Sequence, residues 1–339
     1  MKILVENTVW RNVGDGFYQN ALFSLIKQAC PAHDIFIEEG PVQRAFNIRM
    51  NRIKNNPFQL MDHQKADIHI FSGPIIPQIL TNYKQKIINI INRGDQYVLI
   101  SVSAAGISEP LRLETGQFLK RYPPLFFSSR DEDTYFKFKD FVGNIFNGIC
   151  TAFLVDKTLD IDKFELLNGR PFFISSFYQE LEPVYKMASL NREVNIEDID
   201  LDRKKTFIGL PFDYARHLNF FRPQQTALNN YEIIRVHQDF STHYYHIKFS
   251  HPNSFMSYNP LSYLSIYKSA AFTISDRVHA CAVSLAFGKP ARFMSATPRA
   301  GIFDRLGFNN KNSKGIMYPN SEVIDMEYDK LTKEIKKYF

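Results

Sequence analysis

The sequence predicts an α/β protein with two Rossmann-like domains whose parallel sheets face a central cleft. Three observations lead to this fold class. The 339 residues exceed what one ordinary core requires. Short apolar strands alternate with helices through the first half, and the alternation starts again after a charged stretch. In doubly wound domains ligands bind at the carboxyl ends of the strands, so function is sought in the strand-to-helix turns.

The first half contains five strand signals. Strands are expected over 3–6, 34–38, 67–71, 96–103 and 125–129, and helices over 17–29, 75–92 and 133–141. The first helix has apolar residues at helical spacing and ends before Pro31. Strands separated by helices indicate βαβ units and a parallel sheet.

A change in composition marks the expected domain boundary. Residues 191–205 are dominated by charged side chains, so we predict an N-terminal domain over 1–190 and a C-terminal domain over 204–320. The alternative is one surface segment within a single domain. The second half predicts strands over 206–210, 232–237, 271–275 and 291–294, and helices over 224–229, 260–270 and 279–287. The last segment, 321–339, contains an amphipathic helix expected to pack back towards the interface.

Composition narrows the classes of partner and compartment. The formal charge of +6 suits a phosphorylated substrate or an anionic membrane surface. Lysine and arginine are scattered without nucleic-acid motifs, so no nucleic acid is expected as a partner. Three distant cysteines lack zinc-ligand spacing, and no stretch of about 18 apolar residues occurs. We therefore expect a cytoplasmic protein, with peripheral contact at the inner membrane face.

The most informative turn runs from Thr273 to Ala280, between a buried strand and a helix of small residues. Ser275 ends the strand, and Asp276 can cap the helix, which leaves Arg277 and His279 near the positive end of its dipole. A guanidinium, an imidazole and backbone N–H groups together suit a carboxylate or a phosphate. The alternative is a structural Arg–Asp pair with a capping histidine.

Two further turns follow strands of the first half. The turn Asn12-Val13-Gly14-Asp15-Gly16 allows a close approach of backbone to ligand, and Asp15 is either a general base or a helix N-cap. It lacks the full dinucleotide-binding fingerprint. The other turn, Ser128 to Asp131, offers Arg130 as an anion ligand.

Other residues could carry chemistry but favour ordinary packing. Asp131-Glu132-Asp133 matches the loose D-x-D pattern of metal-dependent glycosyltransferases, although such triplets are common where helices start. His237, His243, His246 and His251 lie close in sequence without helical spacing. Cys281 lies on a helix that we expect to be buried. We expect no metal and no cofactor.

The ordered set of turns resembles the polysaccharide pyruvyl transferase family. The family pattern has an Asn-x-Gly-Asp turn, an Arg-Asp after a strand, and an Arg-Leu-His before an alanine-rich helix and Gly-x-Pro. This chain matches with Asn12, Gly14 and Asp15, with Arg130 and Asp131, and with Arg277-Val278-His279 followed by Gly288-Lys289-Pro290. It departs from the pattern at 103–108, where Gly-x-Gly-x-x-Pro is usual, and at 150–153, where Asp-Pro is usual.

The resemblance implies a GT-B-like fold and a transferase with phosphoenolpyruvate as co-substrate. It implies an acceptor side in the first domain and a donor side in the second. Arg277, His279 and Arg130 would bind phosphoenolpyruvate, and His279 and Asp15 would be the catalytic acid and base. The product would be a pyruvate ketal on a sugar of a polysaccharide or a lipid-linked oligosaccharide.

Two other functions stay open from the sequence. One is a GT-B-type glycosyltransferase that uses a nucleotide sugar. Such enzymes commonly place a Glu in the second domain, yet residues 248–303 contain none, and Asp276 is their only carboxylate. The other is a non-catalytic glycan-binding member of the family.

Overall fold

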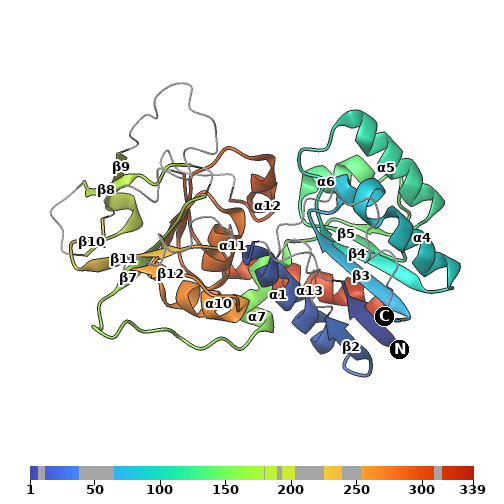
Figure 1. Ribbon diagram of the computed structural model, residues 1–339, viewed down its shortest axis with the longest axis horizontal. Coiled ribbons are helices and arrows are strands. Elements are labelled where there is room, and N and C mark those ends of the chain that lie inside the picture. Colours follow the sequence, from blue (N-terminus) through green and yellow to red (C-terminus); the bar gives the residue numbers. More distant parts are fainter. Residues whose placement is uncertain are drawn as a thin grey trace. The chain divides into compact units, whose positions relative to one another are not determined.

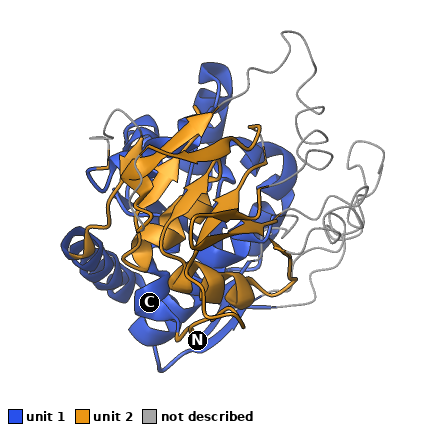
Figure 2. Cartoon of the chain, turned by 90° about the vertical axis from the view of Figure 1, so that its left-hand side faces the viewer, with its two compact units in different colours: residues 1–159, 298–307, 322–339 blue, residues 160–297, 308–321 orange. Residues whose placement is uncertain are grey.

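The chain forms two compact units, each with its own sheet and core (Figures 1 and 2). The computed structural model describes residues 1–6, 12–37, 65–178, 180–188, 193–202, 225–238, 253–308 and 315–339. Unit 1 comprises residues 1–159, 298–307 and 322–339, and unit 2 comprises residues 160–297 and 308–321.

Unit 1 is built on a parallel six-stranded sheet. Its order is β2-β1-β3-β4-β5-β6, with β1 (Lys2–Val5), β2 (Asp34–Ile37), β3 (Ile68–Gly73), β4 (Gln96–Val102), β5 (Phe127–Ser129) and β6 (Ile145–Phe146). The chain passes from β1 to β2 on one side and then to β3 on the other. The topological switch point therefore lies between β1 and β3, where doubly wound folds bind ligands.

Helices cover both faces of this sheet. The helices α4 (Lys84–Asn92), α5 (Glu109–Arg121) and α6 (Glu132–Phe138) share one apolar core with β3, β4 and β5. The helix α1 (Gly14–Ala29) contacts β2 and β3, and short helical segments follow at η4 (Thr151–Leu154) and α7 (Val155–Thr158). The predicted helix over 75–92 is instead divided into η2 (Ile76–Gln78), η3 (Ile79–Tyr83) and α4, with Pro77 in the first turn.

The C-terminal part of the chain completes unit 1. The helix α13 (Ser321–Tyr338) stacks Tyr338 on Phe126 at 4.8 Å between ring centroids. The short segments η7 (Pro298–Ala300) and α12 (Gly301–Asp304) precede Arg305, which donates 2.9 Å hydrogen bonds to Glu327 Oε2 and to the carbonyl of Asn147. The chain therefore begins and ends in the same unit.

Unit 2 contains a mixed sheet with the order β10-β11-β7-β13-β14-β15, and β12 also pairs with β11. Its strands are β7 (Phe172–Ser176), β10 (Ala227–Leu228), β11 (Tyr231–Val236), β12 (Ser254–Phe255), β13 (Thr273–Ser275), β14 (Ala291–Phe293) and β15 (Ile316–Met317). The pairings β10–β11 and β14–β15 are antiparallel and the others are parallel, so the expectation of a wholly parallel sheet is wrong here.

The parallel centre of unit 2 has a switch point of its own. The chain leaves β7, adds β11 on one side and then adds β13 on the other. The helices α10 (Pro260–Ser269) and α11 (Val278–Ala286) pack together, and α11 lies against β13 and β14. A hairpin of β8 (Val184–Met187) and β9 (Ile199–Asp202), with η5 (Ile196–Asp198), shares a second core with the sheet.

The division into units differs from the boundary expected between 190 and 204. Unit 2 begins at residue 160 and not near 204, because β7 pairs with both β11 and β13 at the centre of the second sheet. The part of the charged stretch that the structure describes lies in the β8–β9 hairpin rather than in a linker. Strand pairing, which composition does not report, sets the boundary.

Two further expectations in the second half have different outcomes. The strand expected over 206–210 lies outside the described residues. The helix expected over 224–229 is wrong for residues 225–229, because β10 and β11 form a hairpin through Asn229 and Asn230. Asn229 has a φ of 53°, the left-handed conformation that asparagine tolerates in hairpin turns.

Candidate functional site

The turn between β13 and α11 lies at the switch point of unit 2. Arg277 is the N-cap residue of α11, and His279 is the second residue of the helix; both side chains are half-buried. The buried Ser275 hydroxyl donates to the carbonyl of Ser176 at 2.6 Å and accepts from the Arg277 N–H at 2.9 Å. The end of β7 therefore sets the backbone position of Arg277.

Asp276 has a different role from the one expected. It does not cap α11, because its buried carboxylate turns to the loop after β7. Its oxygens accept hydrogen bonds from the N–H of Tyr178 at 2.9 and 3.0 Å and from the N–H of Glu180 at 2.8 Å. Asp276 thus ties the ends of β7 and β13 together.

Arg277 stacks on an aromatic ring that the sequence analysis did not single out. Its guanidinium carbon lies 4.4 Å from the ring centroid of Tyr178. The positive charge of Arg277 also acts on two buried tyrosines of α10. Burial raises the pKa of Tyr263 to about 12 and raises that of Tyr267 further, whereas the charge of Arg277 lowers the pKa of both. A cation, an imidazole and a helix N-terminus therefore meet at this switch point, a combination that suits an anion.

The turn after β1 in unit 1 begins α1 earlier than expected. Gly14 and Gly16 lie inside the helix, which starts at Gly14 rather than at Phe17. The N-cap residue is Val13, without a side-chain cap, so the N-cap interpretation of Asp15 is wrong. The side-chain oxygen of Asn12 accepts a hydrogen bond from the Gly14 N–H at 3.1 Å. Asp15 is half-buried in the first turn, where the positive end of the helix dipole stabilises a carboxylate.

Arg130 follows β5 and is a buried cation with few partners. Its side chain is 2% exposed, and Nε and Nη1 have no hydrogen-bond partner among the described residues. The nearest carboxylate oxygen, Asp131 Oδ2, lies 4.0 Å from Nε. A buried guanidinium whose nitrogens lack hydrogen-bond acceptors costs free energy, which a bound anion would offset.

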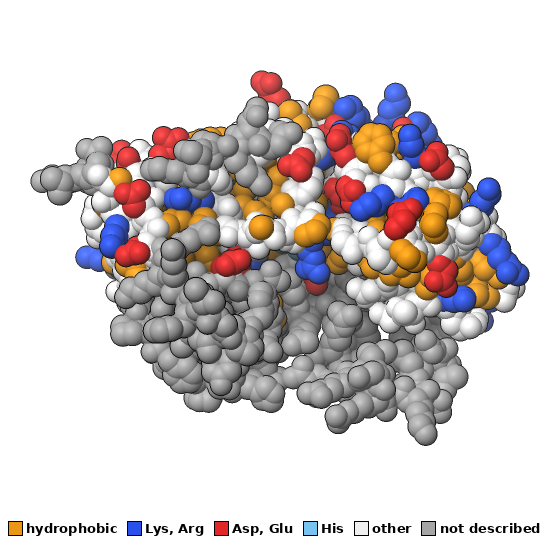
Figure 3. Space-filling view, turned by 90° about the horizontal axis from the view of Figure 1, so that it is seen from above, with side chains coloured by type: hydrophobic (Ala, Val, Ile, Leu, Met, Phe, Trp, Pro, Cys, Tyr) orange, Lys and Arg blue, Asp and Glu red, His pale blue; other side chains and the backbone are white. Residues whose placement is uncertain are grey.

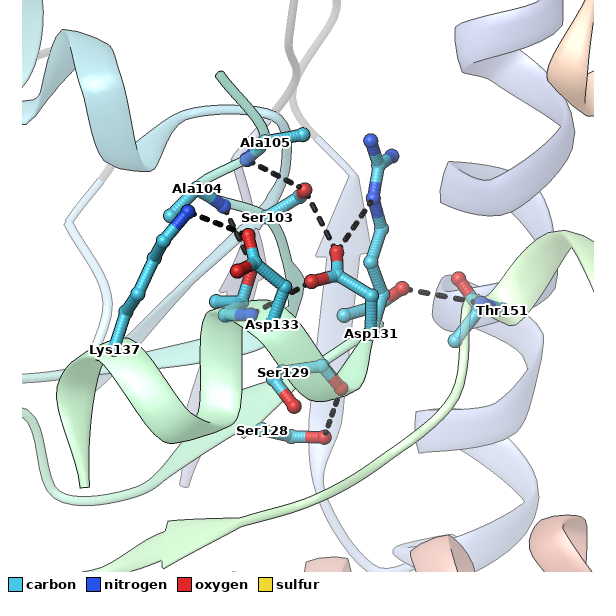
Figure 4. A network of polar contacts seen from close by, with 12 residues as sticks. Ser103, Ala104, Ala105, Ser128, Ser129, Asp131, Asp133, Lys137 and Thr151 are labelled. Carbon is cyan, nitrogen blue, oxygen red and sulfur yellow. Dashed lines mark hydrogen bonds and ion pairs between the residues drawn. The ribbon is translucent and has the colours of Figure 1, made fainter. Parts of the chain in front are cut away.

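Asp131 is held by a network that joins the ends of β4 and β5 (Figure 4). Its Oδ1 accepts from the Thr134 N–H at 2.8 Å, which caps α6, and its Oδ2 accepts from the Ser103 hydroxyl at 2.8 Å. Thr134 Oγ1 in turn accepts from the Ala104 N–H at 2.8 Å. Ser103 and Ala104 lie in the segment where this chain departs from the family pattern. Here a serine hydroxyl joins the end of β4 to Asp131.

Residues 150–151, the other departure from the pattern, connect α1 to the end of β4. Thr151 donates its N–H to Ser101 Oγ at 3.1 Å and its hydroxyl to the carbonyl of Tyr18 at 2.8 Å. Ser101 is buried with a φ of 58°, an uncommon conformation for a serine and one that often marks functional sites. Gly73 has a φ of 84°, and a Cβ there would overlap the Tyr18 hydroxyl.

A third polar cluster in unit 1 was missed by sequence reasoning. Glu6 Oε1 lies 2.6 Å from His69 Nδ1, and Glu6 also pairs with Lys86 of α4. Glu6 and His69 are both buried. An acidic residue at the end of one strand and a histidine inside another gave no signal, because only the pairing of β1 with β3 brings them together.

The metal and nucleophile alternatives gain no support from the described residues. The D-x-D carboxylates serve other purposes, since Asp131 caps α6 and Asp133 pairs with Lys137 at 2.6 Å. In the part of the chain that the structure describes, no group of three or more potential ligands could hold a metal ion. His243, His246 and His251 lie outside the described residues. Cys281 is a buried thiol.

On the face of the molecule shown in Figure 3, positive and negative side chains are mixed. Lysine and arginine side chains are interspersed there with aspartate and glutamate. None of the described helices is both long and apolar enough to pass through a bilayer.

Two Rossmann-like α/β units with polar turns at their switch points define a GT-B-like protein, which confirms the predicted fold class apart from the antiparallel edges of the second sheet. The chain belongs to the polysaccharide pyruvyl transferase family, whose model matches residues 12–297. The resemblance seen in the sequence is thereby confirmed, and the family is one of transferases.

Two solved structures have a similar fold. MnaA of S. aureus, in a co-structure with UDP, has a TM-score of 0.52 and 11% identity over 99% of this chain and 90% of its own. A putative UDP-N-acetylglucosamine 2-epimerase from Listeria monocytogenes has a TM-score of 0.53 and 10% identity over 100% of this chain and 90% of its own. At these identities the likeness concerns the fold alone. No curated protein matches the sequence.

Proposed function

We propose that this protein transfers the pyruvyl group of phosphoenolpyruvate to two hydroxyls of one sugar and forms a cyclic ketal. The observation that carries the proposal is the arrangement at the start of α11, where Arg277 and His279 lie at a helix N-terminus. Phosphoenolpyruvate carries a carboxylate and a phosphate, and both suit a guanidinium and backbone N–H groups. The family to which the chain belongs supplies the reaction class.

The reaction needs an acid and a base. A proton adds to the methylene carbon, which makes the adjacent carbon electrophilic, and a sugar hydroxyl adds to it. Phosphate then leaves with the pair of electrons of its C–O bond, and a second hydroxyl closes the ketal. The two hydroxyl protons balance the one gained by carbon and the one carried away by phosphate.

Each proposed role rests on a different residue. Arg277 binds the carboxylate or phosphate of the donor, and His279 is the acid or the phosphate anchor. Asp15, at the start of α1 in unit 1, is the proposed base towards a sugar hydroxyl. Arg130 is the proposed second anion ligand, supported by its buried Nε and Nη1, which have no hydrogen-bond partner among the described residues. No metal or cofactor enters these steps.

The acceptor is proposed to be a sugar of a polysaccharide or of a lipid-linked oligosaccharide precursor. A lipid-linked acceptor would place the protein at the inner face of the membrane, where the net charge of +6 would favour anionic lipid. Co-sedimentation with phosphatidylglycerol vesicles, compared with phosphatidylcholine vesicles, tests this contact. Equal recovery with both would remove it from the proposal.

Ligand-induced thermal stabilisation tests the donor. A ligand that binds only the native state raises the unfolding midpoint by mass action. Phosphoenolpyruvate should raise it for the wild type and not for Arg277→Ala, which removes a half-buried side chain and little core volume. A response to UDP and UDP-sugars with none to phosphoenolpyruvate would instead favour a nucleotide-sugar enzyme. If Arg277→Ala unfolds, Arg277 is structural.

A further inference from the structure

The loop after β7 is fixed by an ionisable side chain from the next strand of the sheet. Asp276 is only 5% exposed, and a buried carboxylate requires hydrogen-bond donors. It finds them in the backbone N–H groups of Tyr178 and Glu180, at distances of 2.8–3.0 Å. Tyr178 lies 98 residues before Asp276, so this contact exists only in the folded sheet.

The fixed loop places an aromatic ring against Arg277. The guanidinium carbon lies 4.4 Å from the Tyr178 centroid, well within the distance at which a cation is attracted to a ring face. The backbone of the same arginine is fixed by Ser275, which accepts the Arg277 N–H at 2.9 Å. The backbone of Arg277 is therefore oriented through Ser275, and its guanidinium through Tyr178. Both contacts depend on the end of β7 and the loop that follows it.

We infer that Asp276 and Tyr178 are positioning residues that orient the Arg277 guanidinium before the anionic donor arrives. An arginine side chain loses rotamer entropy on binding, and part of that loss is already incurred when the guanidinium is stacked. Stacking engages the face of the guanidinium, whereas a carboxylate or phosphate is recognised by its in-plane N–H fork. The inference rests on the proposed function only in naming phosphoenolpyruvate as the anion.

Substitutions of the ring test the inference by calorimetric titration with phosphoenolpyruvate. Tyr178→Leu removes the π face and should raise Kd by roughly 2- to 30-fold, the range that a cation–π contact supplies. Tyr178→Phe retains the face and should stay within about twofold of the wild type, which separates the ring from its hydroxyl. Tyr318→Leu is the matched control, because it makes the same change at a half-exposed ring of the same unit.

Asp276→Asn tests the inference from the other side of the contact. It keeps Tyr178 but removes the negative charge and one of the two acceptor oxygens that hold the loop. We expect Kd for phosphoenolpyruvate to rise, and adding Tyr178→Leu to this variant should weaken binding by less than it does in the wild type, because both changes release the same arginine.

A measurement without ligand separates this inference from the proposed function. In the NMR spectrum of the ligand-free protein, the Arg277 Nε–Hε signal should carry a ring-current shift. The signal is assigned by its loss in Arg277→Lys. The shift should persist in Tyr178→Phe and disappear in Tyr178→Leu. If the wild type fails to bind phosphoenolpyruvate while the shift behaves in this way, the donor assignment falls and the positioning role stands.

Other results would overturn the positioning role. Equal Kd values for the wild type and Tyr178→Leu would show that the stacked ring contributes nothing to binding. Equal losses in Tyr178→Phe and Tyr178→Leu would assign the effect to the hydroxyl. An Arg277 signal that does not change in Tyr178→Leu would show that the ring does not orient the guanidinium.

Discussion

Replacing Arg130 by methionine should make the ligand-free protein more stable while weakening its response to an anionic ligand. The side chain is 2% exposed, and its Nε and Nη1 atoms find no hydrogen-bond partner among the described residues. Asp131 Oδ2, 4.0 Å from Nε, already accepts the Ser103 hydroxyl. The guanidinium therefore gains little in return for its lost hydration.

The expected magnitude follows from that arrangement. A buried polar group left without a partner costs about 1–3 kcal/mol, and a charged group costs more. Methionine has a similar length and adapts to irregular space, so the substitution should leave no large cavity. Asp131 keeps its hydrogen bonds from Ser103 and Thr134. We expect the free energy of unfolding to rise by about 1–3 kcal/mol.

Urea denaturation of the ligand-free protein and thermal unfolding with phosphoenolpyruvate measure the two effects. Arg93→Met is the matched control in unit 1, because Arg93 forms a surface ion pair with Asp95 at 2.8 Å. Such pairs contribute about 0–1 kcal/mol, so the control should change little. The reasoning would be refuted if Arg130→Met lost more than about 1 kcal/mol of stability and kept the full ligand response.

Three further predictions concern the remaining buried groups. Asp131→Ala removes the cap of α6 and should cost about 0.5–2 kcal/mol in urea denaturation, whereas Asp133→Ala, which breaks an exposed helical pair, should cost about 0.3–0.5 kcal/mol. Burial raises the pKa of Tyr263 from 10.0 to about 12, so this phenol contributes stability below pH 10 that is lost as the pH rises from 10 towards 12. Tyr263→Phe should reduce that alkaline loss of stability; an unchanged pH profile would contradict it. Burial also raises the pKa of the Cys30 and Cys150 thiols, so both should react with a disulfide reagent at pH 8 only after unfolding, and fast reaction of either native thiol would exclude its burial.

Local sequence patterns predicted many, but not all, of the elements in the described residues. The apolar run over 96–103 became β4, and the small-residue helix expected over 279–287 became α11, within one residue at each end. Several elements were missed, among them the short helices α7 and α12, the central strand β7 and the long helix α5. The helix α5 follows Ser108 and has Pro110 in its first turn, a start signal that was present in the sequence. These patterns succeed because periodicity and helix starts depend on residues a few positions apart.

The sequence predicted where the candidate site residues lie along the elements better than it predicted their contacts. Arg277 and His279 lie at the start of α11, as the turn indicated. Asp276 was expected to cap that helix, and the structure assigns its oxygens to the loop after β7 instead. Tyr178 gave no signal, because nothing near it in the sequence marks a ring that will stack on an arginine 99 residues later.

The sequence by itself determined the fold class, the family and the turns in which polar residues gather. These follow from the alternation of apolar and polar residues and from short motifs, which are properties of neighbouring positions. Only the tertiary structure decided that the first 159 residues are completed by α13, and that Asp276 holds the loop of Tyr178. The physical reason is strand order: hydrogen bonds between β7, β11 and β13 bring together side chains about a hundred residues apart, and no local pattern encodes that pairing.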